Sequence, residues 1–253
     1  SCGIPLNGIL LIWGSNFQIP TLDTIQSRQS SQSTKIYDHT GKILLYDVFQ
    51  DKKRTAVPLD QISQHIKDAT IAIENKNFYT DIGIEPLAIM RALFIDITTL
   101  NFTQGASTIT QQVVKNLILT GDKTPTRKIK ELALSVKLQK IITKDEILTM
   151  YLNEMPYGGT VYGVEEASED FFGKPAIDVD IAEAAYLAAL LQAPSYYSPY
   201  GLHRNSLDSR KKLVLKEMHN DKKITDDEYK AALAENVQFL PKDNNSLKAP
   251  HFV

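Results

Sequence analysis

A disulfide within the chain is excluded, because Cys2 is the only cysteine among its 253 residues. An excess of one charge is also lacking. The formal net charge is −2, which gives no overall indication of nucleic-acid binding. The chain has no internal repeats and no low-complexity blocks. Hydrophobic and charged residues make up 43% and 23% of the sequence, as in ordinary globular proteins. The length allows one domain or two small ones.

A hydrophobic run long enough to cross a membrane is missing. The apolar segment 4–14 is shorter than the roughly 20 residues that a spanning helix needs. It also lacks the basic start and the cleavage site of a signal peptide. Two interpretations stay open, a buried strand or the last turns of a transmembrane helix. Trp13 precedes the polar Ser15 and Asn16 and would suit a membrane interface.

The remaining pattern is mostly helical. Residues 23–33 are typical of a polar connector, and residues 34–46 predict two short strands around a turn at Gly41. We expect this to be the only sheet of consequence. From Pro58 onward the pattern indicates helices. The sequence therefore predicts a mainly α protein with a short β element near its N-terminus.

Several helix starts are marked locally. Pro86 suits the first turn of a helix that runs to Ile95, and Asp180 can cap a helix over 181–192. The second of these segments is apolar nearly all round, so we expect it to be buried. Capping boxes, in which a threonine precedes a glutamine or glutamate by three residues, begin at Thr108, Thr143 and Thr225.

Two segments carry groups suited to catalysis or binding. Glu74 follows the apolar run 69–73, so it would lie at a helix end beside a buried surface. A half-sheltered carboxyl group can exchange protons near neutral pH, which general acid–base work requires. Residues 105–112 lead a glycine and several hydroxyls into a helix N-terminus, a natural site for anions or sugar hydroxyls. Taken singly, each segment has a commoner explanation, a solvated glutamate and an ordinary helix cap.

A local excess of basic residues follows. Between Lys115 and Glu146 there are eight basic and four acidic side chains, although the whole chain is slightly acidic. A basic surface of this kind could meet phosphate, acidic lipid headgroups or RNA. For residues 137–144 a solvated helix face is the simpler interpretation.

Five segments, in order and spacing, resemble motifs of the glycosyltransferase domain of class A penicillin-binding proteins and monofunctional transglycosylases. Residues 74–83 resemble Glu-Asp-x-x-Phe-x-x-His-x-Gly. Residues 105–112 match Gly-x-Ser-Thr-Ile-Thr-Gln-Gln at every fixed position. Residues 127–131 fit Arg-Lys-x-x-Glu, residues 144–153 resemble Lys-x-x-Ile-Leu-Glu-x-Tyr-Leu-Asn, and residues 210–215 resemble Arg-Arg-x-x-Val-Leu. One short motif would be weak, whereas five in this order are specific.

The resemblance implies a lysozyme-like, mainly α head with a smaller membrane-proximal jaw. It divides the chain into the tail of a transmembrane helix (1–14), a connector with the β element (15–57), the glycosyltransferase domain (58–240) and the start of a linker (241–253) toward a C-terminal transpeptidase domain. It implies a location on the outer face of the bacterial cytoplasmic membrane with a single N-terminal anchor. Covalent penicillin binding is not expected of these residues.

The resemblance also implies a reaction, the polymerisation of lipid II into glycan strands. Glu74 would be the base that deprotonates the 4-hydroxyl of the acceptor, and undecaprenyl pyrophosphate would leave with inversion. Glu131 would be the second carboxylate, orienting the donor or holding Mg²⁺ or another divalent cation, and no organic cofactor is expected. The implied substrate-binding residues are Asn75, Phe78, Asp81, Ser107, Thr108, Gln111, Gln112, Lys115, Lys123, Arg127 and Lys128.

The implied partners are lipid II, the growing glycan chain and membrane lipid, with cell-division or elongation proteins as further candidates and no nucleic acid. Four positions depart from the usual family pattern. Asn75 stands where aspartate is usual, Asp81 where histidine is usual and Thr149 where glutamate is usual, while Lys123 often has an arginine counterpart. These departures leave the proposed roles intact but bear on the level of activity and the pH optimum.

Three other functions compete. A lysozyme-like hydrolase needs a general acid and activated water, and has no use for the basic residues between Lys115 and Lys128. A non-catalytic scaffold that binds lipid II is suggested by Asn75 and Asp81, but binding alone would require neither Glu74 nor Glu131. RNA binding is disfavoured because no aromatic residues are interleaved with the basic ones.

Overall fold

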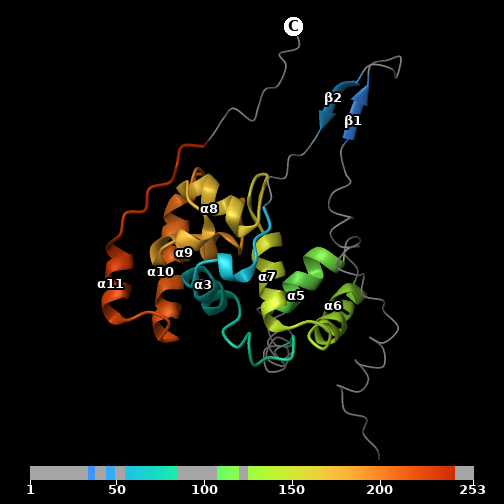
Figure 1. The fold of residues 1–253 in the computed structure, drawn as a ribbon, viewed down its shortest axis with the longest axis horizontal. Helices are drawn as coiled ribbons and strands as arrows, with labels where there is room; N and C mark the ends of the chain where they lie inside the picture. The colour runs from blue at the N-terminus through green and yellow to red at the C-terminus, as the bar shows by residue number, and fades with distance from the viewer. Residues whose placement is uncertain (1–33, 38–43, 49–54, 85–106, 120–124, 243–253) are drawn as a thin grey trace, which may run out of the picture.

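The computed structural model describes residues 34–37, 44–48, 55–84, 107–119 and 125–242 (Figure 1). Helices dominate these ranges, so the prediction of a mainly α fold is confirmed. The α-helices are α3 (Gln64–Glu74), α5 (Ile109–Val113), α6 (Pro125–Leu138), α7 (Lys144–Glu154), α8 (Val164–Phe172), α9 (Ile181–Leu190), α10 (Arg204–Asn220) and α11 (Asp226–Ala234). Shorter turns are the 3₁₀ segments η1 (Leu59–Gln61) and η3 (Ala176–Asp178), and the π-helical η2 (Val114–Ile118).

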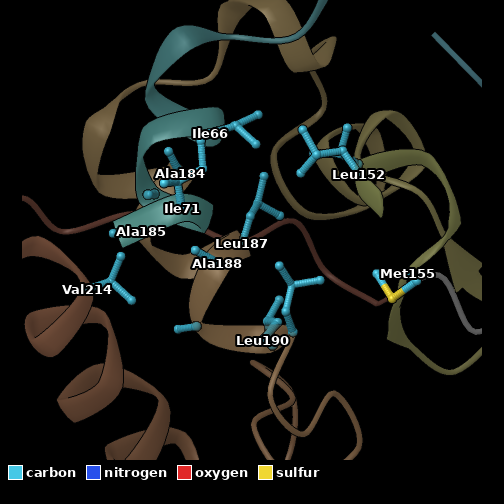
Figure 2. Close-up of a cluster of buried hydrophobic side chains, with 14 of the residues drawn as sticks. Ile66, Ile71, Leu152, Met155, Ala184, Ala185, Leu187, Ala188, Leu190 and Val214 are labelled. Atoms are coloured by element: carbon cyan, nitrogen blue, oxygen red, sulfur yellow. The ribbon is translucent and has the colours of Figure 1, made fainter. Parts of the chain in front are cut away.

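Helix α9 lies at the centre of the core. Every residue from Ala182 to Leu190 is buried, as its nearly uniform apolar pattern predicts. Helices α3 and α10 both pack against it. Figure 2 shows Ile66 and Ile71 of α3 close to the alanines of α9, with Val214 of α10 nearby. The end of α3, which carries Glu74, is thereby fixed to the best-packed part of the molecule.

Two groups of helices are visible in Figure 1. Helices α3, α8, α9, α10 and α11 form one group, while α5, α6 and α7 form the other. Contacts between α5 and both α6 and α7 hold the second group together. The second and third sequence motifs thus belong to this group, while the fifth lies on α10.

Local capping explains where several helices begin. The boxes predicted at Thr108, Thr143 and Thr225 are all present, and Asp180 forms a fourth with Glu183. In each box the cap side chain accepts a hydrogen bond from the backbone N–H of the third helical residue. The side chain of that residue in turn accepts a hydrogen bond from the backbone N–H of the cap. Helix α9 ends at Leu190, slightly before the predicted end. The helix predicted from Pro86 to Ile95 lies outside the described residues.

The strands are short. β1 (Thr34–Tyr37) pairs antiparallel with β2 (Leu44–Val48), which confirms the predicted β element. A second hairpin joins β3 (Pro156–Gly158) to β4 (Val161–Tyr162), so the expectation of a single sheet of consequence was wrong. Strands of this length carry too few residues to show an alternating pattern. The pair forms because Gly158 and Gly159 adopt φ values of 121° and 57° and turn the chain sharply.

Among the described residues, no helix is both long and apolar enough to cross a membrane. Residues 1–14, where the tail of a transmembrane helix is predicted, lie outside that part of the chain.

Candidate functional site

Glu74 is the last residue of α3, because Asn75 leaves the helical conformation with φ −160° and ψ 78°. The Glu74 side chain is 12% exposed. Its Oε2 accepts a hydrogen bond of 2.7 Å from Gln112 Nε2 of α5. Its Oε1 lies 3.7 Å from a guanidinium nitrogen of Arg210 on α10, which is an ion pair but too long for a hydrogen bond. Two helices far apart in sequence therefore orient one carboxylate.

Two buried tyrosines accompany this carboxylate. The Tyr151 hydroxyl of α7 donates to Gln112 Oε1 at 3.1 Å. Burial, with a smaller contribution from the charge of Glu74, raises the pKa of Tyr151 well above its ordinary value. The same two causes raise the pKa of Tyr157, whose hydroxyl has no hydrogen-bond partner among the described residues. Both hydroxyls thus stay protonated, but only that of Tyr151 is hydrogen-bonded to a partner of Glu74.

Ser107 connects Glu74 to the second predicted carboxylate. Its carbonyl oxygen accepts from Gln112 Nε2 at 3.4 Å, and its hydroxyl accepts from Lys128 Nζ at 3.2 Å. Lys128 also donates to Glu131 Oε1 at 2.5 Å. Glu131 is only 4% exposed, whereas the Lys128 side chain is 55% exposed. A continuous series of contacts therefore joins the first three motifs.

Three of the predicted substrate-binding residues, Asn75, Thr108 and Gln111, form hydrogen bonds with backbone groups around the start of α5. Asn75 Oδ1 accepts from the Ile109 N–H at 3.2 Å. Thr108 accepts from the Gln111 N–H and donates to the Gly83 carbonyl at 2.8 Å, while the Gln111 side chain accepts from the Thr108 N–H. All three side chains are buried. Their contacts fix where Gln112 stands, and a direct role in substrate binding stays a prediction.

Asp81 and Phe78, both predicted to bind substrate, make contacts within the protein, and a role in substrate binding stays a prediction for both. Phe78 is fully buried in the core. Asp81 Oδ1 accepts from Lys144 Nζ at 2.7 Å, Gln139 Nε2 at 3.0 Å and the Gly83 N–H at 2.8 Å. Through Gln139 and Lys144 these contacts tie the first motif to the residue after α6 and to the first residue of α7. The charge of Asp81 is thus balanced by Lys144, and its described contacts do not include Glu74.

The basic residues lie near the join of α5, η2 and α6. Lys115 is exposed on η2, and Lys128 is exposed on α6. Arg127 donates to the carbonyls of Lys115 and Leu119 at 3.3 and 3.0 Å, and so closes the C-terminal end of η2. This arrangement keeps Arg127 beside Lys115. Lys123 lies outside the described residues.

Arg210 and Tyr151 were missed as site residues. Both lie inside recognised motifs, the fifth and the fourth, but no role was assigned to them. Arg210 also donates from Nε to the Ala189 carbonyl at 3.2 Å and lies over the Tyr197 ring. A cavity of about 450 Å³ adjoins it, lined by Tyr197, Asn205, Ser206, Ser209, Arg210 and Leu213. The motifs were a signal of importance, but only the tertiary fold brings Arg210 to Glu74 and Tyr151 to its partner Gln112.

The predicted divalent cation can be compared only with the acidic, histidine and cysteine side chains of the described residues. No group of three or more histidine, cysteine, aspartate or glutamate side chains converges among them. Glu131 Oε1, the predicted ligand, is already bonded to the ammonium of Lys128. The divalent cation stays a prediction.

Comparison with known proteins agrees with the five motifs. Residues 41–219, more than half of the chain, match the family described as Transglycosylase. The chain is 38% identical over 230 residues to penicillin-binding protein 1A of Aquifex aeolicus, covering 91% of this chain and 31% of that protein. It is 34% identical over 252 residues to penicillin-binding protein 1A of Vibrio cholerae, covering 96% of this chain and 30% of that protein.

A crystal structure of penicillin-binding protein 1A from Haemophilus influenzae is also similar, with a TM-score of 0.45 and 26% identity. The match covers 83% of this chain and 21% of that chain. The chain belongs to the transglycosylase family, which confirms the resemblance drawn from its motifs. It spans about a third of the length of the curated relatives that it matches.

Proposed function

We propose that this chain is a peptidoglycan glycosyltransferase that polymerises lipid II into glycan strands and releases undecaprenyl pyrophosphate. The observation that carries the proposal is the series of contacts from Glu74 through Gln112, Ser107 and Lys128 to Glu131. This series links the sheltered carboxylate of Glu74 to the carboxylate of Glu131, which is paired with the exposed Lys128. That combination suits proton removal at one end and diphosphate binding at the other.

Glu74 acts as the general base in this proposal. With Oε2 occupied by Gln112, Oε1 is the oxygen left to accept the proton of the acceptor 4-hydroxyl. The alkoxide that develops attacks the anomeric carbon of the growing chain from the face opposite the leaving group, so the configuration inverts. The bond from that carbon to the diphosphate oxygen breaks, and its electron pair leaves with the lipid diphosphate.

The basic residues would stabilise the leaving group. Charge that develops on the diphosphate needs fixed cations close by, because such preorganised groups lower the barrier most effectively. Lys128 and Lys115 are exposed near the join of η2 and α6, and Arg127 fixes η2, which carries Lys115. Glu131 pairs with Lys128 and so orients its ammonium group. The predicted divalent cation would share this role at the diphosphate, with Glu131 as its ligand.

The relatives' names also support a setting at the cell wall. We propose that the protein works on the outer face of the cytoplasmic membrane, where lipid II and the growing strand are its substrates. Cell-division or elongation proteins are proposed as further partners.

The test is polymerisation of fluorescent lipid II in detergent with Mg²⁺, with products separated on a gel. We expect a ladder of polymer from the parent chain and none from Glu74→Gln. Glu169→Gln is the matched control, because Glu169 is an exposed carboxylate on α8. It should polymerise as the parent does. A parallel reaction with EDTA in place of Mg²⁺ tests the predicted cation.

The alternatives give other patterns. A non-catalytic scaffold would bind lipid II with no polymer from any variant. A hydrolase would shorten preformed glycan instead of building it. Either outcome would overturn the proposal.

A further inference from the structure

We propose that Tyr151 is a positioning residue for the base, and that it acts through the side-chain amide of Gln112. This inference rests on the proposed function and deepens it. It concerns how Glu74 is held, and it also changes the part assigned to Gln112. The family motif suggested substrate binding for Gln112, whereas both ends of its amide are used within the protein.

The direction of each hydrogen bond follows from the chemistry of the groups. An ionised carboxylate only accepts, so the group of Gln112 that faces Glu74 Oε2 must be its NH₂. The amide oxygen therefore faces Tyr151 and needs a donor. Tyr151 supplies one, since burial raises its pKa and keeps the phenol protonated. Each bond thus fixes the orientation of the next.

Tyr151 is well placed to transmit rigidity. Its ring is fully buried, and α7 is packed against α5. Gln112, by contrast, projects from a five-residue helix that continues into a π turn, and its long side chain has several rotatable bonds. Without the Tyr151 hydroxyl, rotation of the amide would leave Glu74 Oε2 without its partner. The base would then spend less time with Oε1 directed at the acceptor.

Tyr157 offers a matched comparison. It is also buried, and its pKa is raised by the same two causes, including the charge of Glu74. Its hydroxyl, however, has no hydrogen-bond partner in the described part of the chain. Phenylalanine at either position removes one buried hydroxyl and keeps the ring. Only the change at Tyr151 removes the bond to Gln112.

The experiment measures kcat and KM for lipid II polymerisation by the parent, Tyr151→Phe and Tyr157→Phe. We expect Tyr151→Phe to lower kcat roughly tenfold with KM nearly unchanged, because a misoriented base weakens the transition state and not the binding. Tyr157→Phe should stay within about twofold of the parent in both constants. Thermal unfolding of each variant reports whether the fold is kept.

A double-mutant cycle separates action through Gln112 from any other route. If Tyr151 works through Gln112, then Gln112→Ala with Tyr151→Phe should be no slower than Gln112→Ala alone. Additive losses in kcat would overturn the inference, as would a rise in KM in place of the fall in kcat. If the parent is active and Tyr151→Phe has the same kcat, the inference is also overturned.

If the parent makes no polymer, that result counts against the proposed function and leaves the role of Tyr151 undecided. A measurement independent of turnover therefore tests the role of Tyr151 by itself. The ¹³C signal of the Glu74 carboxyl, assigned from its loss in Glu74→Gln, should move in Tyr151→Phe and much less in Tyr157→Phe. A carboxyl signal that responds equally to both variants would refute the link through Gln112.

Discussion

Lys144 Nζ lies 2.7 Å from Asp81 Oδ1 and 4.8 Å from the centre of the Phe78 ring, so one lysine contacts two residues of the first motif. The Asp81 side chain is 3% exposed and that of Lys144 is 19% exposed. The pair therefore ties the loop after Glu74 to the start of α7. Aspartate at this position has an evident structural role in this chain, although the family usually has histidine there.

Asp81→Asn should destabilise the fold by about 1–3 kcal/mol, because Lys144 would keep a partly buried charge without its partner. Urea unfolding followed by circular dichroism measures the change. Asp60→Asn serves as the control, since Asp60 is exposed and its loss should change stability by about 0.5 kcal/mol or less. Equal effects of the two substitutions would show that the ion pair contributes nothing.

Gly83→Ala should be strongly unfavourable. Gly83 has φ +90°, and an added Cβ would lie 2.7 Å from the Ser135 carbonyl oxygen in α6. We expect a loss of at least about 2 kcal/mol in the free energy of unfolding, from strain and from displacement of α6. Gly159→Ala is the comparison, because Gly159 also has a positive φ of 57° but nothing within 4 Å. It should cost about 1 kcal/mol. Similar losses at both sites would show that the close approach to Ser135 adds nothing to the cost of the positive φ.

Asn153→Ala tests how the fourth motif supports the fold. The Asn153 amide donates to the carbonyls of Val57 and Thr149 at 2.8 and 2.9 Å and accepts from the Val57 N–H at 2.9 Å. Its removal leaves backbone groups unpaired, so we expect a loss of about 2–3 kcal/mol in thermal or urea unfolding. The exposed Asn236→Ala should have little effect. An unchanged unfolding midpoint for Asn153→Ala would mean that water replaces these bonds.

The sequence was a reliable guide where structure is set locally. Capping boxes depend on residues three apart, so Thr108, Thr143 and Thr225 could be assigned as helix starts without knowledge of the fold. The burial of α9 followed from its composition. Motif order was enough to identify the family, because five independent matches in one order rarely arise by chance.

Relationships across the fold were beyond such reasoning. Arg210 meets Glu74 because α3 and α10 pack against each other and against α9. Asp81 lies only seven residues after Glu74, but its ion-pair partner is Lys144 of the fourth motif, which no sequence pattern indicated. The hairpin of β3 and β4 was invisible because its strands are too short to show a period.

Lys211 should make the stability of the protein depend on pH above neutrality. Its side chain is 3% exposed, donates to the Ala232 carbonyl and lies over the Tyr186 ring. Burial lowers the pKa of Lys211 below 10.5 in the folded state. Between that lowered value and 10.5 the unfolded chain binds more protons, so the contribution of Lys211 to stability rises with pH.

Lys211→Met removes this titration while keeping a long apolar side chain. The free energy of unfolding of the variant minus that of the parent should therefore fall as the pH rises from 7 toward 10. Chemical denaturation at a series of pH values measures it.

Lys212→Met is the control, because Lys212 is the exposed neighbour and carries the same charge. For each variant, the quantity compared is its free energy of unfolding minus that of the parent. If this difference is the same function of pH for Lys211→Met and Lys212→Met, burial of Lys211 has no energetic consequence. A difference that grows with pH would reverse the sign argued here and indicate that the partners of Lys211 outweigh its burial.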